Sequence, residues 1–99
     1  MDGTEAAEYS GEKGDGLDDA ARRRRLKFRA WHRGMREVDL LLGRFADASV
    51  NGMAEADLAA FEALLDVPDP DILGWITGEL VVPEDDETPL VRQLIAFHR

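Results

Sequence analysis

Residues 35–48, MREVDLLLGRFADA, are the stretch that decides the fold class of this chain. Their large apolar side chains include Val38, Leu41, Leu42 and Phe45, which recur at spacings of three and four residues. A helix makes one turn in about 3.6 residues, so this spacing gathers these side chains on one helix face. The stretch therefore predicts an amphipathic helix whose apolar face other helices must cover.

The segment before this stretch predicts a first helix that begins after Leu17 and runs to about His32. Asp18 or Asp19 supplies its N-cap, because a carboxylate there accepts hydrogen bonds from the free amides of the first turn. Gly34 is predicted to end the helix, since a glycine just past a helix end readily takes the left-handed conformation.

A third helix is predicted after the turn at Asn51-Gly52, because apolar residues recur at helical spacing within residues 58–65. Ala54 occupies its N-cap position and offers no side-chain acceptor, which forgoes about 1 kcal/mol of capping. We therefore expect the start of this helix to fray.

Two proline pairs predict the last two helices. Asp69-Pro70 and Thr88-Pro89 each place a capping side chain before a proline at the first helical position. They predict a short helix over residues 69–77, closed by Gly78, and a final helix that begins at Pro89.

The remaining large apolar residues are assigned to packing. Trp31 and Trp75 are predicted to lie in the core, Phe97 to face inward, and Val81 and Val82 to tie the loop of residues 79–87 to the core. Alternation of apolar and polar residues does not persist for the length of a strand. The predicted fold is all-α, a small five-helix bundle.

Length and composition disfavour several function classes. A chain of 99 residues forms one small domain and leaves little room for an enclosed active-site cavity. It has no cysteine, and His32 and His98 lie outside any metal-binding spacing with carboxylates, so we expect neither catalysis nor a metal site. No apolar run approaches a membrane span and no targeting segment stands out, so we expect a soluble, cytoplasmic protein.

The net charge of −9 is distributed unevenly. Residues 1–21 carry −6, residues 22–44 carry +7 and residues 45–99 carry −10. Residues 1–16, acidic and rich in glycine, are predicted to be a disordered leader before the helical domain of residues 17–99. The run Arg22 to Arg25 encircles its helix and is either a solvated face or a protein-docking face, since the overall charge disfavours nucleic acid.

Residues 33–37, RGMRE, gather charged side chains at the junction of the first two helices. A structural interpretation places Arg33 at the negative end of one helix, Gly34 at the cap, and Glu37 at the positive start of the next. A functional interpretation has Gly34 allow close approach of a partner, while Arg33 and Glu37 offer paired charges and Met35 an adaptable apolar contact. The residues alone leave both open.

The same stretch resembles the RGxxE motif of the SdhE family, the FAD assembly factors of succinate dehydrogenase. Val38-Asp39-Leu40 follows it, as in the family, and residues 61–65, FEALL, match as well. Residues 69–76, DPDILGWI, are similar to the family's DPDLxxW segment. The resemblance covers about residues 22–99, and the two motifs in order make it specific.

The resemblance implies an assembly chaperone and not an enzyme. It would promote covalent attachment of FAD to the flavoprotein subunit of succinate dehydrogenase or of fumarate reductase, and would bind no cofactor stably itself. Arg33, Gly34 and Glu37 would contact the partner, with Met35 and Arg36 as neighbours in the interface. We expect a monomer.

Two other functions stay open from the sequence. One is a helical protein-binding adaptor, or an antitoxin-like module, with an unrelated partner. The other is a nucleic-acid binder that uses Arg22 to Arg25, whose binding would weaken steeply with salt.

Overall fold

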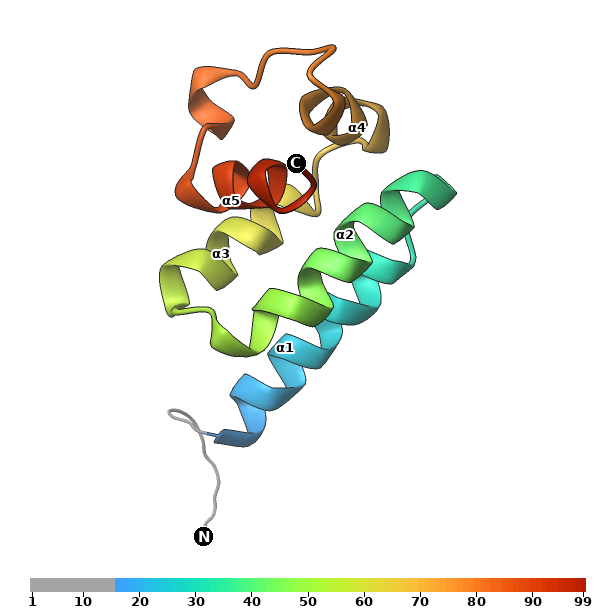
Figure 1. The fold of residues 1–99 in the computed structure, drawn as a ribbon. Helices are drawn as coiled ribbons and strands as arrows, with labels where there is room; N and C mark the ends of the chain where they lie inside the picture. Colours follow the sequence, from blue (N-terminus) through green and yellow to red (C-terminus); the bar gives the residue numbers. More distant parts are fainter. Residues whose placement is uncertain (1–15) are drawn as a thin grey trace, which may run out of the picture.

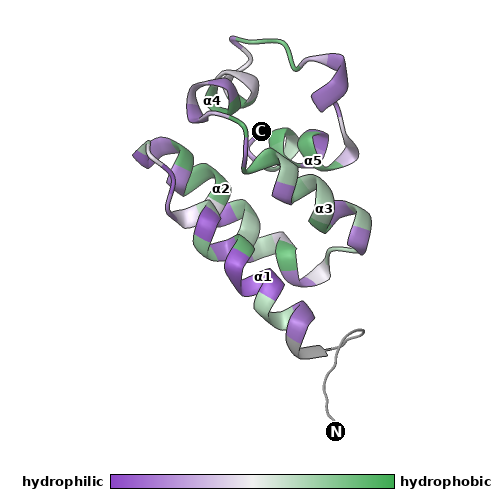
Figure 2. Ribbon diagram, turned by 180° about the vertical axis from the view of Figure 1, so that it is seen from behind, coloured by the Kyte–Doolittle hydropathy of each residue, from purple (hydrophilic) through white to green (hydrophobic). Residues whose placement is uncertain are grey.

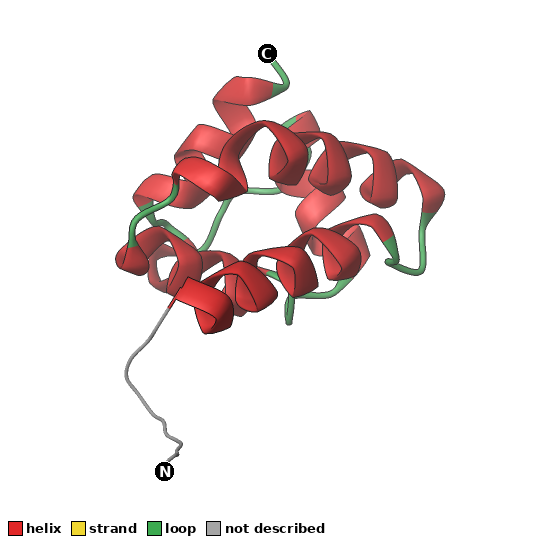
Figure 3. Ribbon diagram, turned by 90° about the horizontal axis from the view of Figure 1, so that it is seen from below, coloured by secondary structure: helices red, strands yellow, loops and turns green. Residues whose placement is uncertain are grey.

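The computed structural model describes residues 16–99, which form five α-helices and two short 3-10 turns (Figure 1). The helices are α1 (Gly16–Trp31), α2 (Arg36–Ser49), α3 (Glu55–Leu64), α4 (Asp69–Thr77) and α5 (Pro89–Phe97), and the turns are η1 (Val50–Gly52) and η2 (Glu84–Asp86). These residues contain no strand (Figure 3), which confirms the predicted all-α, five-helix fold. The predicted leader lies outside the described residues except for Gly16, which begins α1.

Two long helices form the base of the molecule. α1 and α2 lie side by side as a hairpin, and α3, α4 and α5 pack together along one side of it (Figure 1). α4 contacts both α2 and α5, so the chain segment that opens α4 lies beside the hairpin. This contact brings two segments distant in sequence, the α1–α2 turn and the start of α4, into one place.

The core is apolar and draws on all five helices. Phe45 of α2 lies at its centre, edge to face with Phe61 at 5.9 Å and with Phe97 at 5.6 Å between ring centroids. The described residues include no buried polar or charged residue, and α3, α5 and part of α2 carry the most hydrophobic segments (Figure 2). Burial of these faces is what selects the bundle, as the spacing in α2 predicted.

Three predicted helix ends are confirmed. α3 follows Ala54 with no side-chain cap. The Thr88 hydroxyl accepts a hydrogen bond from the Val91 amide at 3.1 Å, and Gly78 ends α4 with φ +87°. The bounds of α2 and α4 agree with prediction within one residue.

Three predicted caps are wrong. Neither Asp18 nor Asp19 is the N-cap of α1, because the helix already begins at Gly16 and both residues lie within its first turn. Gly34 is not left-handed, because Gly78 is the one glycine with positive φ among the described residues. Asp69 is not the N-cap of α4: Pro68 occupies that position, and Asp69 is the first helical residue. The Asp69 carboxylate instead accepts hydrogen bonds from the α1–α2 turn, which offers it a guanidinium as well as amides.

The predicted packing also needs correction at the surface. Val81 is 91% exposed, and Phe97 is 46% exposed although its ring contacts Phe45. Val82 and Trp75 do pack in or against the core as predicted. Trp31 is half-buried, and its ring lies over Gly43, where a Cβ atom would come within 2.2 Å of it.

Candidate functional site

The RGMRE stretch begins in the turn between α1 and α2, at the end of the hairpin beside α4 (Figure 1), and its last two residues, Arg36 and Glu37, begin α2. Arg33 points into the molecule, and its side chain is only 12% exposed. Its Nε donates to Asp69 Oδ1 at 2.8 Å, while Nη1 and Nη2 donate to the carbonyls of Leu65 and Val67. One guanidinium therefore joins the α1–α2 turn to the α3–α4 turn.

Two carboxylates hold the backbone of this turn. The amides of Gly34 and Met35 donate to Asp69 Oδ2 at 2.8 Å and 3.0 Å, and the Arg33 amide donates to Asp39 Oδ1 at 2.5 Å. Three consecutive amides thus have carboxylate acceptors from α2 and α4. Charge-assisted hydrogen bonds of this kind are stronger than neutral ones, so the turn has a fixed conformation.

The ionisation of Asp69 depends on these contacts. Burial alone would raise the pKa of its carboxyl. The hydrogen bonds from Arg33, Met35 and Gly34 outweigh burial, so the pKa of Asp69 lies below its ordinary value. The carboxylate is therefore charged at neutral pH and keeps its partners.

The other residues of the stretch divide between the inside and the outside. Met35 is half-buried and packs against the core, whereas Gly34, Arg36 and Glu37 are exposed. The Arg36 and Glu37 side chains make no hydrogen bond or ion pair with residues 16–99, and both follow directly on the fixed turn. The predicted role of Arg33 to Glu37 in partner contact stays a prediction.

Gly34 has no internal reason to be glycine. Its φ is negative, and a Cβ atom would lie 3.5 Å from Asp69 Oδ2, an ordinary van der Waals distance. The position itself is exposed. Any steric requirement for glycine here must therefore come from outside the described part of the chain.

The arginine run is split by its contacts. Arg22 donates to Glu62 and Glu55 at 2.6–3.0 Å, and Arg23 donates to Asp19 and to the carbonyls of Val50 and Met53. The hydrogen bonds to Glu62 and Glu55 raise the pKa of Arg22 above its ordinary value. These two arginines join α1 to η1 and α3.

Arg24 and Arg25 are exposed and pair with nothing in residues 16–99. For these two arginines the solvated-face and protein-docking interpretations both stay open, and the four bases of the run do not form one continuous patch.

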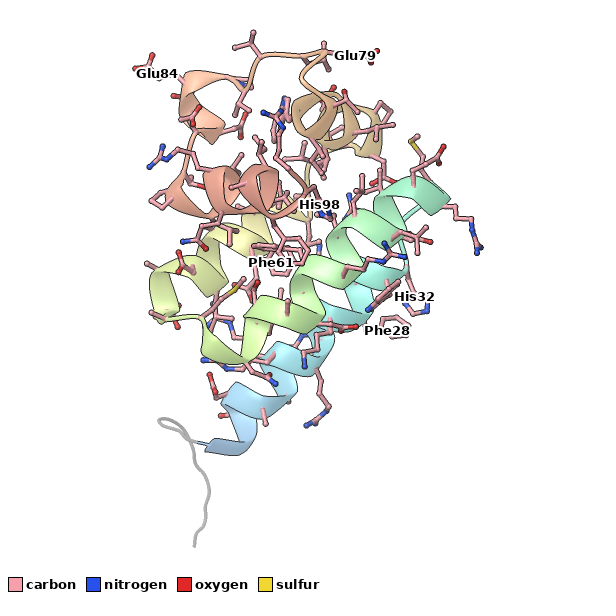
Figure 4. All side chains as sticks on the ribbon, viewed as in Figure 1. Phe28, His32, Phe61, Glu79, Glu84 and His98 are labelled. Carbon is pink, nitrogen blue, oxygen red and sulfur yellow. The ribbon has the colours of Figure 1, made fainter. Side chains whose placement is uncertain are left out.

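The outer side of α1 carries an aromatic pair that the sequence interpretation missed. Phe28 is 62% exposed and stacks on His32, with ring centroids 3.9 Å apart (Figure 4). The spacing of four residues, on the helix face opposite the buried Leu26 and Ala30, is the signal that could have found it. Arg24, also exposed, lies one turn earlier on the same face of the helix.

Nothing in residues 16–99 suggests a metal or membrane site. They contain no cluster of three or more metal-ligating side chains, and no helix among them is long and apolar enough to span a membrane. A pocket between α3 and α5, lined in part by Trp75, Asp85 and Asp86, has a volume of about 70 Å³. That is smaller than the roughly 300 Å³ of the smallest typical ligand sites, so this pocket does not hold a dinucleotide.

The fold and this site define a small helical domain in which a charged turn between two helices is held by hydrogen bonds to two carboxylates. Comparison with known proteins makes the class specific. Residues 24–98 match the sequence model of Sdh5, described as flavinator of succinate dehydrogenase, and the chain belongs to this family. The resemblance predicted from the two motifs is confirmed, and the family is one of assembly factors.

Curated relatives agree with this family. The chain is 45% identical over 80 residues to the FAD assembly factor SdhE of Acetobacter pasteurianus, a match that covers 81% of this chain and 73% of that protein. It is 41% identical over 76 residues to the mitochondrial succinate dehydrogenase assembly factor 2 of Dictyostelium discoideum, covering 77% and 53%. The chain thus spans about half the length of that mitochondrial relative.

Proposed function

We propose that this chain is an FAD assembly factor that binds the flavoprotein subunit of succinate dehydrogenase and promotes covalent attachment of FAD to it. The observation that carries the proposal is the geometry of the α1–α2 turn. Within the residues that match the family, this turn is fixed from inside by two carboxylates and presents Gly34, Arg36 and Glu37 to solvent.

The five residues of the RGMRE stretch contribute in different ways. Arg36 and Glu37 offer opposite charges to the partner, Met35 a partly exposed thioether, and Gly34 a backbone that a partner can approach closely. Arg33 contributes from within, because its guanidinium is already paired with Asp69. Phe28 and His32 supply apolar area beside the turn, which is where protein interfaces gain most of their affinity.

The chain promotes the reaction by binding and not by chemistry of its own. Covalent attachment joins the flavin to a histidine of the flavoprotein, and FAD stays with that subunit. The assembly factor holds the domains of the partner in the geometry in which this bond forms, a contribution of positioning. We extend the proposal to the flavoprotein of fumarate reductase as an alternative partner, and to a cytoplasmic monomer as the acting form.

The test is the flavin fluorescence of the flavoprotein after denaturing electrophoresis, which retains covalent flavin only. The flavoprotein is produced with the wild-type chain, without it, and with Glu37→Ala. Glu79→Ala is the matched control, because Glu79 is an exposed glutamate outside the turn, in the loop that follows α4 (Figure 4). We expect fluorescence with the wild type and Glu79→Ala, and its loss without the chain and with Glu37→Ala.

Equal fluorescence in all four samples would reject the proposal, provided that flavin attachment in the same host depends on an assembly factor. The chain would then be an adaptor with another partner. The nucleic-acid alternative has less support than it had from sequence, since Arg22 and Arg23 are already engaged by carboxylates and carbonyls.

A further inference from the structure

Asp69 is the point at which the second motif of the chain meets the first. It opens α4, stands 36 residues beyond Arg33, and has a side chain only 11% exposed. Its two oxygens have separate tasks: Oδ1 accepts from the Arg33 guanidinium, and Oδ2 accepts from the amides of Gly34 and Met35. Within residues 16–99, all its side-chain hydrogen bonds go to the α1–α2 turn.

The consequence concerns the two exposed charges that follow. Arg36 and Glu37 have no internal partners, so their placement depends on the backbone from which they project. That backbone is anchored by the amides just before them. If those amides lost their acceptor, the turn would sample other conformations, and a partner would have to order it on binding at a cost in affinity.

We propose that Asp69 is a positioning residue for partner binding. It fixes the backbone of residues 33–35, so that Arg36 and Glu37 are already in place when the flavoprotein binds. This inference rests on the proposed function and extends it to a residue outside the RGMRE stretch. Asp69 acts through the turn and needs no contact with the partner. It also explains why the two motifs occur together in one small domain.

The variant Asp69→Asn tests this, because it keeps the shape and one acceptor oxygen but removes the charge. Asp71→Asn is the matched control: Asp71 lies in the same first turn of α4, shares the helix-dipole effect, is exposed, and does not contact the α1–α2 turn. The measurement is the rate of covalent flavin attachment at increasing concentrations of each full-length variant.

We expect Asp69→Asn to raise the half-saturating concentration about tenfold while the rate at saturation stays that of the wild type. Amide hydrogen exchange at Gly34 and Met35 should become about tenfold faster, because their acceptor is weakened. Asp71→Asn should change neither quantity. A folded Asp69→Asn protein with the half-saturating concentration of Asp71→Asn would overturn the inference.

Thr88→Ala distinguishes a positioning role of Asp69 from a purely structural one, because it removes the N-cap of α5, which is not part of the turn. If Thr88→Ala, with a similar loss of thermal stability, raised the half-saturating concentration as much, the effect would be one of stability and the inference would fall. Failure of the proposed function looks different, since the wild-type chain itself would then not promote attachment.

Discussion

Two charged connections of this molecule can be compared: the α1–α2 turn at residues 32–35, followed by Arg36 and Glu37, and the loop of residues 79–87. Both are exposed, and the loop has the higher charge density, with five acidic residues. In the turn, three consecutive amides are held by carboxylates from α2 and α4. In the loop, the backbone hydrogen bonds are local, such as Asp86 to Pro83, and one acidic side chain, Glu87, pairs with Arg92.

From this difference we expect that exposed charge alone does not make a recognition site. A charged side chain on a loosely held loop loses conformational entropy when a partner binds it, which offsets most of the gain. On an anchored turn the backbone has already lost much of its freedom during folding, so binding has less backbone entropy left to remove. The turn has the anchored geometry, and it is the segment that carries the family motif.

The largest expected difference is in how much the ion pair of each region, Arg33–Asp69 in the turn and Arg92–Glu87 in the loop, contributes to the free energy of unfolding. Arg33→Ala removes the donor to Asp69 Oδ1 and the donors to the carbonyls of Leu65 and Val67. We therefore expect the free energy of unfolding to fall by about 2–4 kcal/mol. Arg92→Ala removes an exposed pair with a 3.5 Å separation and should cost less than about 0.5 kcal/mol. Urea unfolding followed by circular dichroism measures both, and equal losses would contradict the comparison.

Substitutions of two glycines, Gly78 just before the loop and Gly34 in the turn, should affect stability and function differently. Gly78→Ala forces an alanine into φ +87°, which costs about 1 kcal/mol and should leave flavin attachment intact. At Gly34 an added Cβ makes only an ordinary contact and the position is exposed, so we expect thermal unfolding of Gly34→Arg to stay close to that of the wild type while flavin attachment is lost. Thermal melts and the in-gel fluorescence of the flavoprotein test the pair, and a large destabilisation by Gly34→Arg would count against partner contact at this position.

The sequence predicted the helices well but not the anchoring of the turn. Periodicity and proline-capping signals are local, so the bounds of α2 and α4 and the caps at Gly78 and Thr88 came out correctly. The local rule predicts Asp69 as a cap because it cannot represent an arginine 36 residues away. Only the folded chain brings these two residues together.

The same limit applies to the arginine run. Arg22 to Arg25 are identical in type, so the local sequence does not indicate which of them pairs with a carboxylate of α3. The packing of α1 on α3 places Arg22 beside Glu62 and Glu55. The exposed pair Phe28 and His32 is a different case, since its helical spacing was present in the sequence and pointed away from the core.

Acid should weaken the anchored turn more than the loop. Because the folded-state pKa of Asp69 lies below its ordinary value of 3.8, its ionised form stabilises the fold above that pH. This contribution declines as pH falls below that value and is lost once pH passes through the folded-state pKa. The stability difference between wild type and Asp69→Asn should be constant near neutral pH and shrink below about pH 4. Urea unfolding of both proteins at a series of pH values checks this, and a difference that grew on acidification would contradict it.

The smallest effect is expected in the loop itself. The double substitution Asp85→Asn, Asp86→Asn removes two exposed or half-exposed charges that have no ion-pair partner in residues 16–99. Stability should change by less than about 0.5 kcal/mol, and flavin attachment should keep its wild-type concentration dependence. If attachment instead required a higher concentration of the variant while its melting temperature stayed unchanged, the acidic loop would be a second contact with the partner. Anchoring would then not be what distinguishes a recognition site from a charged surface in this fold.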